Sequence, residues 1–370
     1  MTSMKGPLVG VAAAAMMFAG ISMSTVRSST TRVGSVRAGK PMLEPRSGHT
    51  ATLLADGRVL IAGGMRRNQD FYKSAEVYDP KSETFNATGE MELGRVGQAA
   101  VRLADGQVLI AGGWIGHGST DEAELYDPGT GKFTKVGKMT AKRGRPSATL
   151  LRNGDVLIAG GGEHDAPGGV STAEVFRAMT RTFVATAPMH DARISHTATL
   201  LGDGRVLIAG GRGERVNASA EIYDPGTMRF TLTGAMKSAR YKHTAGLLPD
   251  GRVLVAGGSD ERDWNGALSS AEIYDPKLGG FRETESLAES RFKLPDEAAT
   301  LNDGNLLIAG GSKEVELYDS RGGGFLAVAG VLSGPWHFMT ETRLNDGSVL
   351  LTGGYANDDR ATAETYRYVP

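Results

Sequence analysis

Residues 193–236 contain the two stretches that decide the fold: RISHTATLLGDGRVLIAGG at 193–211 and SAEIYDPGTMRFTLTGAM at 219–236. Short apolar and β-branched runs bounded by turn residues predict four strands, at residues 196–201, 205–211, 220–223 and 230–236. Asp203-Gly204 is a two-residue hairpin signal, and Asp224-Pro225 marks a second turn. The almost continuous apolar run after Arg205 predicts a strand buried on both faces. One such sheet cannot cover both of its own faces, so it needs neighbours.

The same pattern occurs seven times along the chain. A hairpin residue followed by glycine recurs at Asp56, Asp105, Asn153, Asp203, Asp250, Asp303 and Asp346, and a Gly-Gly pair begins seven residues after each. A glutamate with an aromatic residue two positions later marks the third strand, at Glu76, Glu124, Glu174, Glu221, Glu272, Glu316 and Glu364. The hairpins are 43 to 53 residues apart, which is the range of four-stranded propeller blades. We therefore predict an all-β fold, a seven-bladed β-propeller of four-stranded antiparallel blades.

These residues resemble the Kelch repeat, of the type found in exported bacterial proteins. The resemblance rests on the apolar run ending in Gly-Gly, on the tyrosine after the glutamate, and on a phenylalanine seven residues further on, where tryptophan is usual. It covers the chain after residue 31 and implies the propeller fold. It does not specify a function, because propellers include oxidases, epimerases and binding modules. The Kelch-type copper oxidases need a tyrosine cross-linked to cysteine, and this chain has no cysteine.

The ends of the chain predict how the ring closes. An apolar residue ends each fourth strand, 15 residues after the glutamate, at Met91, Met139, Met189, Met236, Leu287 and Val331. The chain stops at Pro370, before blade seven reaches this position. Residues 33–42 resemble the missing strand, and Met42 takes the place of the closing residue. We expect this N-terminal strand to complete the last blade and remove an open sheet edge, with the blades running from residue 43 to 370.

Residues 1–24 are typical of a signal peptide. Lys5 supplies a positive start, the apolar run from Leu8 to Ala19 is too short to span a bilayer, and Ser22 and Ser24 suit a cut before Thr25. The alternative is an uncleaved N-terminal anchor. We expect an exported protein (periplasmic, extracellular or at the cell surface) whose residues 25–370 form a single propeller without an integral membrane segment.

The composition excludes several classes of site. The formal net charge of −1 does not favour nucleic acid as a partner. The absence of cysteine excludes disulfides, thiolate metal sites and cysteine nucleophiles. No histidine pair has helical metal-binding spacing, and no phosphate-binding loop or catalytic triad is assignable. We expect no metal, no cofactor and a monomer, and we name no catalytic residue.

One arginine per blade follows the closing residue by four positions: Arg46, Arg95, Arg143, Arg193, Arg240 and Arg291, with Pro335 in its place in blade seven. Such a ring invites an anion-binding interpretation. An arginine that recurs once in every blade is more simply explained by a structural role, in which it pairs with carbonyl groups or with the repeated glutamate. We therefore predict that these arginines are buried, and that His49, His196 and His243, which share one repeat position, are packed strand residues.

Variation between the repeats points to the loops between the second and third strands. The Gly-Gly-to-glutamate distance ranges from 6 to 15 residues, whereas the other spacings are nearly constant. Neutral variation is the alternative explanation, but loops on a rigid scaffold are where binding usually resides. The loop face supplies the candidate ligand-binding residues: Arg66, Arg67, Trp114, His117, Arg145, Glu163, His164, Arg212, Glu214, Lys242, Trp264, Lys293, Trp336 and His337.

Kelch domains that recognise acidic peptides point the residue two beyond the motif arginine into the central mouth. By this resemblance, the positions are Gly48, Gly97, Arg145, Ser195, Lys242, Lys293 and His337. We favour a binding module for a protein or glycan, with an anionic group held beside blades five to seven. The alternative is a carbohydrate-active enzyme similar to the Kelch-type sialic-acid mutarotases, for which Glu163 and Glu214 are the candidate acids. A purely structural surface protein is the third possibility.

Overall fold

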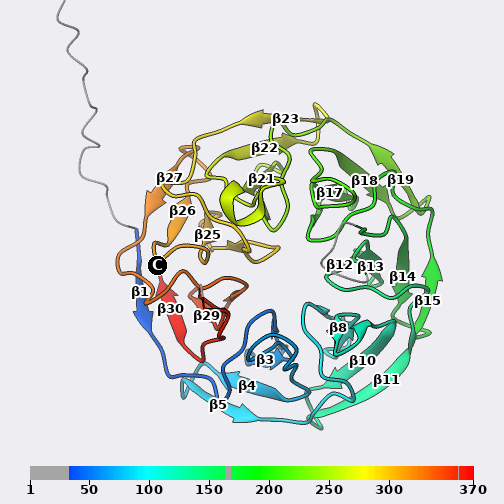
Figure 1. Cartoon of the computed structure of the whole chain (residues 1–370), viewed down its shortest axis with the longest axis vertical. Helices are drawn as coiled ribbons and strands as arrows, with labels where there is room; N and C mark the ends of the chain where they lie inside the picture. Colours follow the sequence, from blue (N-terminus) through cyan, green and yellow to red (C-terminus); the bar gives the residue numbers. More distant parts are fainter. Residues whose placement is uncertain (1–32, 163–167, 357) are drawn as a thin grey trace, which may run out of the picture. The chain divides into compact units, whose positions relative to one another are not determined.

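The computed structural model describes residues 33–162, 168–356 and 358–370. The predicted signal peptide and the lead-in after it lie outside these residues. The described residues form one compact unit, which contains seven four-stranded antiparallel sheets arranged as blades around a central axis (Figure 1). The predicted seven-bladed β-propeller is confirmed.

Each blade has its first strand nearest the axis and its fourth strand at the rim. Blades one to three contain β2 (Thr50–Leu53), β3 (Val59–Ala62), β4 (Ala75–Asp79) and β5 (Thr84–Ala87); β6 (Ala99–Arg102), β7 (Val108–Ala111), β10 (Glu122–Asp127) and β11 (Lys132–Lys138); and β12 (Ser147–Leu150), β13 (Val156–Ala159), β14 (Ala173–Arg177) and β15 (Thr182–Ala185). Blades four and five contain β16 (Thr197–Leu200), β17 (Val206–Ala209), β18 (Ala220–Asp224) and β19 (Arg229–Leu232); and β20 (Thr244–Leu247), β21 (Val253–Ala256), β22 (Ala271–Asp275) and β23 (Gly280–Glu283). Blades six and seven contain β24 (Ala299–Thr300), β25 (Leu306–Ile308), β26 (Glu316–Tyr318) and β27 (Phe325–Ala327); and β28 (Thr340–Arg343), β29 (Val349–Thr352), β30 (Thr365–Val369) and β1 (Ser35–Ala38). A small ribbon of β8 (Trp114–Ile115) and β9 (Gly118–Ser119) and a 3₁₀ helix, η1 (Asp263–Gly266), lie in the loops.

The hydrophobic core lies between neighbouring blades. The second strands are buried on both faces, as the apolar run after Arg205 predicts. One cluster joins Leu207 of blade four to Val255 and Tyr274 of blade five, and equivalent clusters lie between the other blades. Full burial of one such side chain contributes roughly 1.5–3 kcal/mol, so no blade is stable without its neighbours.

The repeated hairpin is one residue longer than the predicted two-residue turn. In blade one, the Gly57 amide donates to Leu54 O at 3.1 Å, and the Leu54 amide donates to Arg58 O at 2.8 Å. The loop therefore contains residues 55–57, and only its glycine has positive φ, at 89°. The Asp56 carboxylate accepts the Arg58 amide at 3.0 Å, which explains why aspartate recurs at this position.

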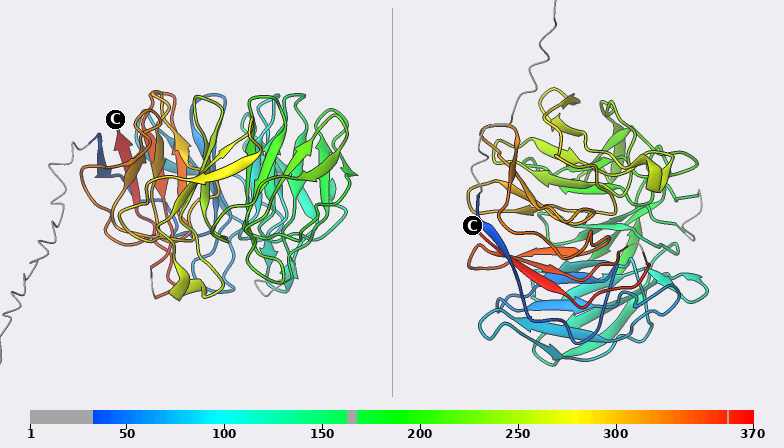
Figure 2. Two further views of the ribbon diagram at one scale, coloured as in Figure 1. Left: turned by 90° about the horizontal axis from the view of Figure 1, so that it is seen from above. Right: turned by 60° about the vertical axis from the view of Figure 1, so that its left-hand side comes forward.

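The N-terminal strand closes the ring as predicted. β1 pairs with β30 in antiparallel register, with Val36 opposite Tyr368, and lies at the rim beside the C-terminus (Figures 1 and 2). The Met42 amide donates to Ala363 O at 2.8 Å, and the Met42 side chain is 4% exposed. Both ends of the chain therefore contribute strands to one sheet, and β30 is not left as an exposed edge.

The repeat register changes by one residue at the end of blade six. Val331, the predicted closing residue, is 56% exposed, whereas Leu332 is 1% exposed. The Leu332 amide donates to Lys313 O at 2.9 Å, as the Met91 amide donates to Lys73 O in blade one. The prediction for Val331 is therefore wrong, because the segment between β27 and Leu332 contains one additional residue.

This shift places Trp336, not Pro335, at the arginine position of blade seven. The Gly311 amide donates to Trp336 O at 3.3 Å, as the Gly64 amide donates to Arg95 O at 2.8 Å. The spacing to the hairpin confirms the change, because ten residues separate Trp336 from Asp346, as in blades one to five.

The seventh glutamate is also misassigned. Tyr368 pairs with Val349 as the repeat tyrosine does in blade one, so Tyr366, two residues earlier, occupies the glutamate position. Trp336 Nε1 lies 3.5 Å from the Tyr366 hydroxyl, where the other blades have an arginine and a glutamate. Glu364 is exposed, because it has no buried arginine to pair with.

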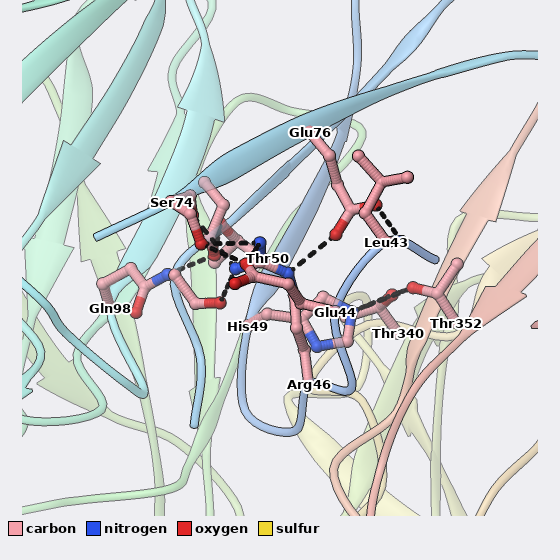
Figure 3. Close-up of polar contacts among 12 residues, drawn as sticks. Leu43, Glu44, Arg46, His49, Thr50, Ser74, Glu76, Gln98, Thr340 and Thr352 are labelled. Atoms are coloured by element: carbon pink, nitrogen blue, oxygen red, sulfur yellow. Dashed lines mark hydrogen bonds and ion pairs between the residues drawn. The ribbon is translucent and has the colours of Figure 1, made fainter. Parts of the chain in front are cut away.

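The six motif arginines are all buried, at 0–1% exposure, so the structural prediction is confirmed. In blade one, Arg46 Nε donates to Glu76 at 2.9 Å and Nη1 donates to Gly63 O at 2.8 Å (Figure 3). The second oxygen of Glu76 accepts the Leu43 amide at 2.7 Å, so the pair joins the third strand to the chain entering the blade. Each of the other five arginines also pairs with the glutamate of its own blade.

The three repeated histidines are buried and packed, as predicted, but each lies immediately before the first strand of its blade and not within it. His49 Nε2 lies 2.9 Å from Thr352 Oγ1, and His196 Nε2 lies 2.9 Å from Ser147 Oγ, each across a blade boundary. His243 makes the same kind of contact with Thr197 at 3.1 Å. Burial lowers the pKa of His49 and of His196 to about 3, so both side chains are neutral in the folded protein.

The long loops between second and third strands gather on the face where one blade connects to the next. Isolated bridges such as Ser47–Met65 and Tyr241–Ser259 join each connection to the loop of its own blade. η1, at the lower edge of the ring in the left view of Figure 2, belongs to this loop face. Within the residues described, no helix has the length and apolar character that a membrane crossing requires.

Candidate functional site

A ring of backbone segments surrounds the axis at the loop face. Gly48, Gly97, Arg145, Ser195, Lys242, Lys293 and Phe338 all have positive φ, between 50° and 62°. Hydrogen bonds link several of them around the ring, from the Gly97 amide to Gly48 O at 2.9 Å and from the Arg145 amide to Gly97 O at 2.8 Å. Non-glycine residues in this conformation are strained by roughly 1–2 kcal/mol each, and such strain is concentrated at functional sites.

The first six members of the ring are the positions that the Kelch resemblance implies, but the seventh is not. His337 pairs with Tyr355 as Tyr241 pairs with Ser259, one residue before the ring position. Phe338 is the blade-seven member, so the assignment of His337 to this position is wrong, for the same one-residue shift. The His337 imidazole packs against two aromatic side chains, with ring-centre distances of 5.0 Å to Trp264 and 5.3 Å to Phe292.

Two cavities lie along the axis. One, at the loop face, has a volume of about 400 Å³ and is called the mouth cavity here. Its lining residues are Met65, Asn68, Gln69, Phe71, Val96, Trp114, Ile115, Gly116, His117, Gly118, Arg145, Lys242, Lys293, Phe338 and Tyr355. The second, the channel cavity, has a volume of about 280 Å³ and is lined mainly by the first strands. Arg145 and Phe338 line both cavities.

Arg145 is held by aromatic rings and by no acidic side chain. Its guanidinium carbon lies 3.5 Å from the centre of the Phe338 ring and 5.6 Å from that of Trp114. Within the described ranges, Arg145 forms no ion pair, and its buried Nε has no hydrogen-bond partner. A cation placed between two cavities in this way offers its donors to a ligand.

Two lysines from neighbouring blades line the same cavity. Lys242 Nζ lies 3.1 Å from Asp263 Oδ1, and the Tyr241 hydroxyl donates to the same oxygen at 2.5 Å. Burial opposes ionisation of Asp263, but the hydrogen bond from Tyr241 and the charge of Lys242 together lower its pKa. η1 thus places a counter-ion beside Lys242.

Lys293 lies in an aromatic environment and is only 5% exposed. Its ammonium is 3.6 Å from the centre of the Trp264 ring and donates to the Tyr355 hydroxyl at 2.5 Å. Burial, followed by the nearby charge of Lys242, lowers the pKa of Lys293 to about 7. The neutral amine of Lys293 is therefore substantially populated near neutral pH.

Of the candidates proposed from the sequence, Trp114, His117, Arg145, Lys242 and Lys293 line the mouth cavity, and Trp264 contacts it through Lys293. The others lie elsewhere. Arg66 and Arg67 are exposed, with Arg66 paired to Asp70, and Glu214 is exposed as well. Trp336 packs against the core between blades six and seven.

Arg212 lies 5.6 Å from the Tyr241 ring, at the side of the mouth. Glu163 and His164 lie outside the described residues.

Sequence reasoning missed the carboxyl groups of the channel cavity. Asp296, Glu297 and Glu341 line it near blades six and seven. Asp296 is exposed to the space inside the channel, and its enclosure by the channel walls, which limits its contact with bulk water, raises its pKa to about 6. Burial also raises the pKa of Glu341 to about 8, although the Ala309 and Ala299 amides donate to it. The two additional residues between Arg291 and its hairpin were the available signal, because they lengthen the inner segment of blade six.

A copper-radical site does not fit these residues. The chain has no cysteine for the tyrosine cross-link. Over the part of the chain that the structure describes, no group of three histidine, cysteine, aspartate or glutamate side chains is placed to hold a metal ion. We therefore derive no step through such a centre.

Comparisons with known proteins agree with the architecture. The family model described as Kelch motif matches residues 45–92 and 95–140, which are the first two repeats. A solved fungal alcohol oxidase of the AA5 family, in complex with copper, aligns with a TM-score of 0.74 at 17% identity, over 92% of this chain and 77% of that one. This likeness shows the fold alone. The search of curated proteins gave no match. Two matched motifs, five further repeats of the same pattern and seven closed blades identify the chain as a Kelch-repeat β-propeller.

Proposed function

We propose that the protein is a binding module that holds an anionic group of a glycan or protein ligand in the mouth cavity. The observation that carries this proposal is the convergence of Arg145, Lys242 and Lys293, from three blades, on one cavity of about 400 Å³. Lys242 pairs with Asp263, whereas Arg145 forms no ion pair among the described residues. Trp114 and Phe338 add aromatic surface for the rest of the ligand.

The test compares charged and neutral forms of the same ligands. An array of acidic glycans and acidic peptides, each beside a neutral counterpart, should show retention of the acidic members. For any ligand retained, Arg145→Gln and Lys242→Ala should weaken binding at least tenfold and flatten its salt dependence. Arg66→Ala is the matched control, since it removes a loop-face cation paired to Asp70 outside the cavity. Equal losses in all three variants would show a diffuse charge effect, and equal retention of neutral ligands would contradict the proposal.

The alternative, a carbohydrate-active enzyme, is favoured by one observation. Asp296 has a raised pKa and lies in the channel cavity, on the far side of Arg145 from the mouth. A carboxyl group of this kind is suited to general acid–base chemistry. Interconversion of sugar anomers that is lost in Asp296→Asn and retained in Glu214→Gln would establish this activity in place of simple binding.

We also propose that the chain acts after export, because residues 1–24 have the pattern of a cleaved signal peptide. Expression of the full chain in a bacterium, followed by fractionation and N-terminal sequencing, should give an exported protein that begins at Thr25. An intact N-terminus in the membrane fraction would support the anchor alternative.

A further inference from the structure

The mouth cavity contains a lysine whose surroundings differ from those of a simple anion-binding residue. Lys293 lines the cavity, but it is only 5% exposed, and no carboxylate lies within ion-pair distance of it in the described parts of the chain. The rings of Trp264, Tyr355 and Phe292 lie 3.6, 5.1 and 5.2 Å from the nitrogen. An anion-binding lysine is normally hydrated, whereas this amine is largely removed from water.

A hydroxyl group is in direct contact with this amine. Lys293 Nζ donates to the Tyr355 Oη at 2.5 Å, across the boundary between blades six and seven. When the amine is neutral, the same hydroxyl is placed to donate a proton to an oxygen atom bound next to the nitrogen. A lysine amine in a desolvated site beside other cations is the arrangement that activates lysine as a nucleophile toward carbonyl groups.

The charges around Lys293 support this role. Lys242 and Arg145 lower its pKa, Asp263 and Asp359 raise it, and burial is the largest contribution toward the value of about 7. His337, packed against Trp264, is itself held neutral because burial lowers its pKa to about 4. Near neutral pH, therefore, a large fraction of Lys293 is the free amine, and the Arg145 guanidinium in the same cavity can hold a carboxylate.

We propose that Lys293 is a carbonyl-reactive amine that condenses with small 2-oxo acids in the mouth cavity. The proposal rests on the anion-binding role proposed above, because Arg145 and Lys242 would hold the carboxylate while the oxo carbon meets Lys293. The nitrogen lone pair attacks the carbonyl carbon, and the carbonyl oxygen takes a proton from Tyr355, which recovers one from the nitrogen. The hydroxyl group of this adduct takes the proton that the lysine ammonium gave up to solvent before the attack, the carbon–oxygen bond breaks, and water leaves as the carbon–nitrogen double bond forms. One ammonium and one oxo acid give one protonated imine and one water, without oxidation or reduction.

Reductive trapping tests this proposal without knowledge of the natural ligand. The purified chain is incubated at pH 7 with sodium cyanoborohydride and either pyruvate or acetone, and the modified lysines are mapped by peptide mass spectrometry. We expect Lys293 to be labelled at least tenfold faster than the exposed Lys313 on the same face, and its labelling rate to reach half its maximum near pH 7. Labelling distributed over the lysines according to exposure would overturn the proposal.

The two carbonyl compounds separate this proposal from the proposed function. Labelling of Lys293 by both compounds, with pyruvate at least tenfold faster, supports the reactive amine and also the anion-binding function. Labelling of Lys293 by both at equal rates supports the reactive amine and contradicts anion binding in the mouth. Absence of selective labelling by either overturns the reactive amine alone, and the ligand array then decides the binding function.

Three variants complete the experiment. Lys293→Arg retains the charge but should abolish adduct formation, whereas Lys313→Arg should leave it unchanged. Tyr355→Phe keeps the ring and removes the hydroxyl, so it should slow labelling several-fold if Tyr355 transfers the proton. Equal labelling of Tyr355→Phe and the parent chain would overturn that role, and persistent labelling in Lys293→Arg would overturn the site.

Discussion

At the scale of single residues, the buried arginine–glutamate pairs are the charges that the fold depends on. Arg143 donates to Glu174 at 2.8 Å and to the carbonyl oxygens of Gly160 and Thr172, with both side chains of the ion pair fully buried. Arg143→Met would leave a buried carboxylate without its partner, which costs about 3–5 kcal/mol. We expect chemical denaturation to show this loss, and a smaller one for Arg143→Met combined with Glu174→Leu.

Blade seven already shows that an uncharged pair is tolerated, since Trp336 and Tyr366 occupy these positions. Arg58→Ala is the control, because its pairing with Asp56 is exposed and contributes only about 0–1 kcal/mol. A double variant as unstable as the single one would show that the carbonyl contacts of Arg143, and not its ion pair, provide the stabilisation.

The buried histidines predict a specific sensitivity to acid. His49 and His196 have pKa values of about 3 in the folded protein and near 6.5 when unfolded. A lowered pKa means that the unfolded state binds the proton first, so stability is complete above pH 6.5 and falls as the pH decreases toward 3. Each histidine contributes a slope of up to about 1.4 kcal/mol per pH unit. Denaturation of His196→Gln between pH 7.5 and 4.5 should show a shallower decline than the parent chain, and an unchanged slope would contradict this account.

At the scale of elements, blade six departs from the repeat and Glu341 of β28 compensates for it. β24 has only two residues, and the Glu341 carboxyl accepts the Ala299 and Ala309 amides at 3.1 and 2.7 Å. Burial raises the pKa of Glu341 from 4.5 to about 8, so its contribution is complete below pH 4.5 and is lost as the pH rises through 8.

Glu341→Gln does not titrate, so the advantage of the parent chain over this variant should shrink between pH 5 and 8. Glu341→Ala, which leaves two amides without an acceptor, should cost about 1–3 kcal/mol per unsatisfied group. The measurement is urea denaturation of the three chains at each pH. A difference between parent and Gln variant that grows with pH would contradict the raised pKa.

At the scale of the whole molecule, closure by β1 holds the ring together. A chain starting at Leu43 loses the pairing with β30 and the burial of Val36 and Met42, which contribute roughly 1.5–3 kcal/mol each when fully buried. We expect its melting temperature to lie at least about 5 °C below that of a chain starting at Thr25. A chain starting at Val33 is the control, and its melting temperature should equal that of the chain starting at Thr25. Equal melting temperatures for all three would contradict closure by this strand.

The sequence alone determined the seven blades, their N-terminal closure and the burial of the motif arginines and histidines. These features were predictable because the same residues make the same contacts within each blade, so the contacts recur in the sequence as a regular spacing. The wrong assignments at Val331, Pro335 and His337 share one cause, an additional residue before Leu332 that the hydrogen bonds show. Glu364 was misassigned because Tyr366 occupies the glutamate position of blade seven.

Only the tertiary structure decided what lies at the axis. Arg145, Lys242 and Lys293 were recognisable one by one as inward residues, but their shared cavity and their partners depend on how seven blades close around one centre. The same holds for Trp264, which reaches Lys293 from the loop of another blade, and for Asp296 and Glu341 in the channel. A repeat pattern specifies the contacts within a blade and with its neighbours. The radius of the closed ring sets the distances between residues of different blades, and those distances determine the pKa of Lys293 and the chemistry available to it.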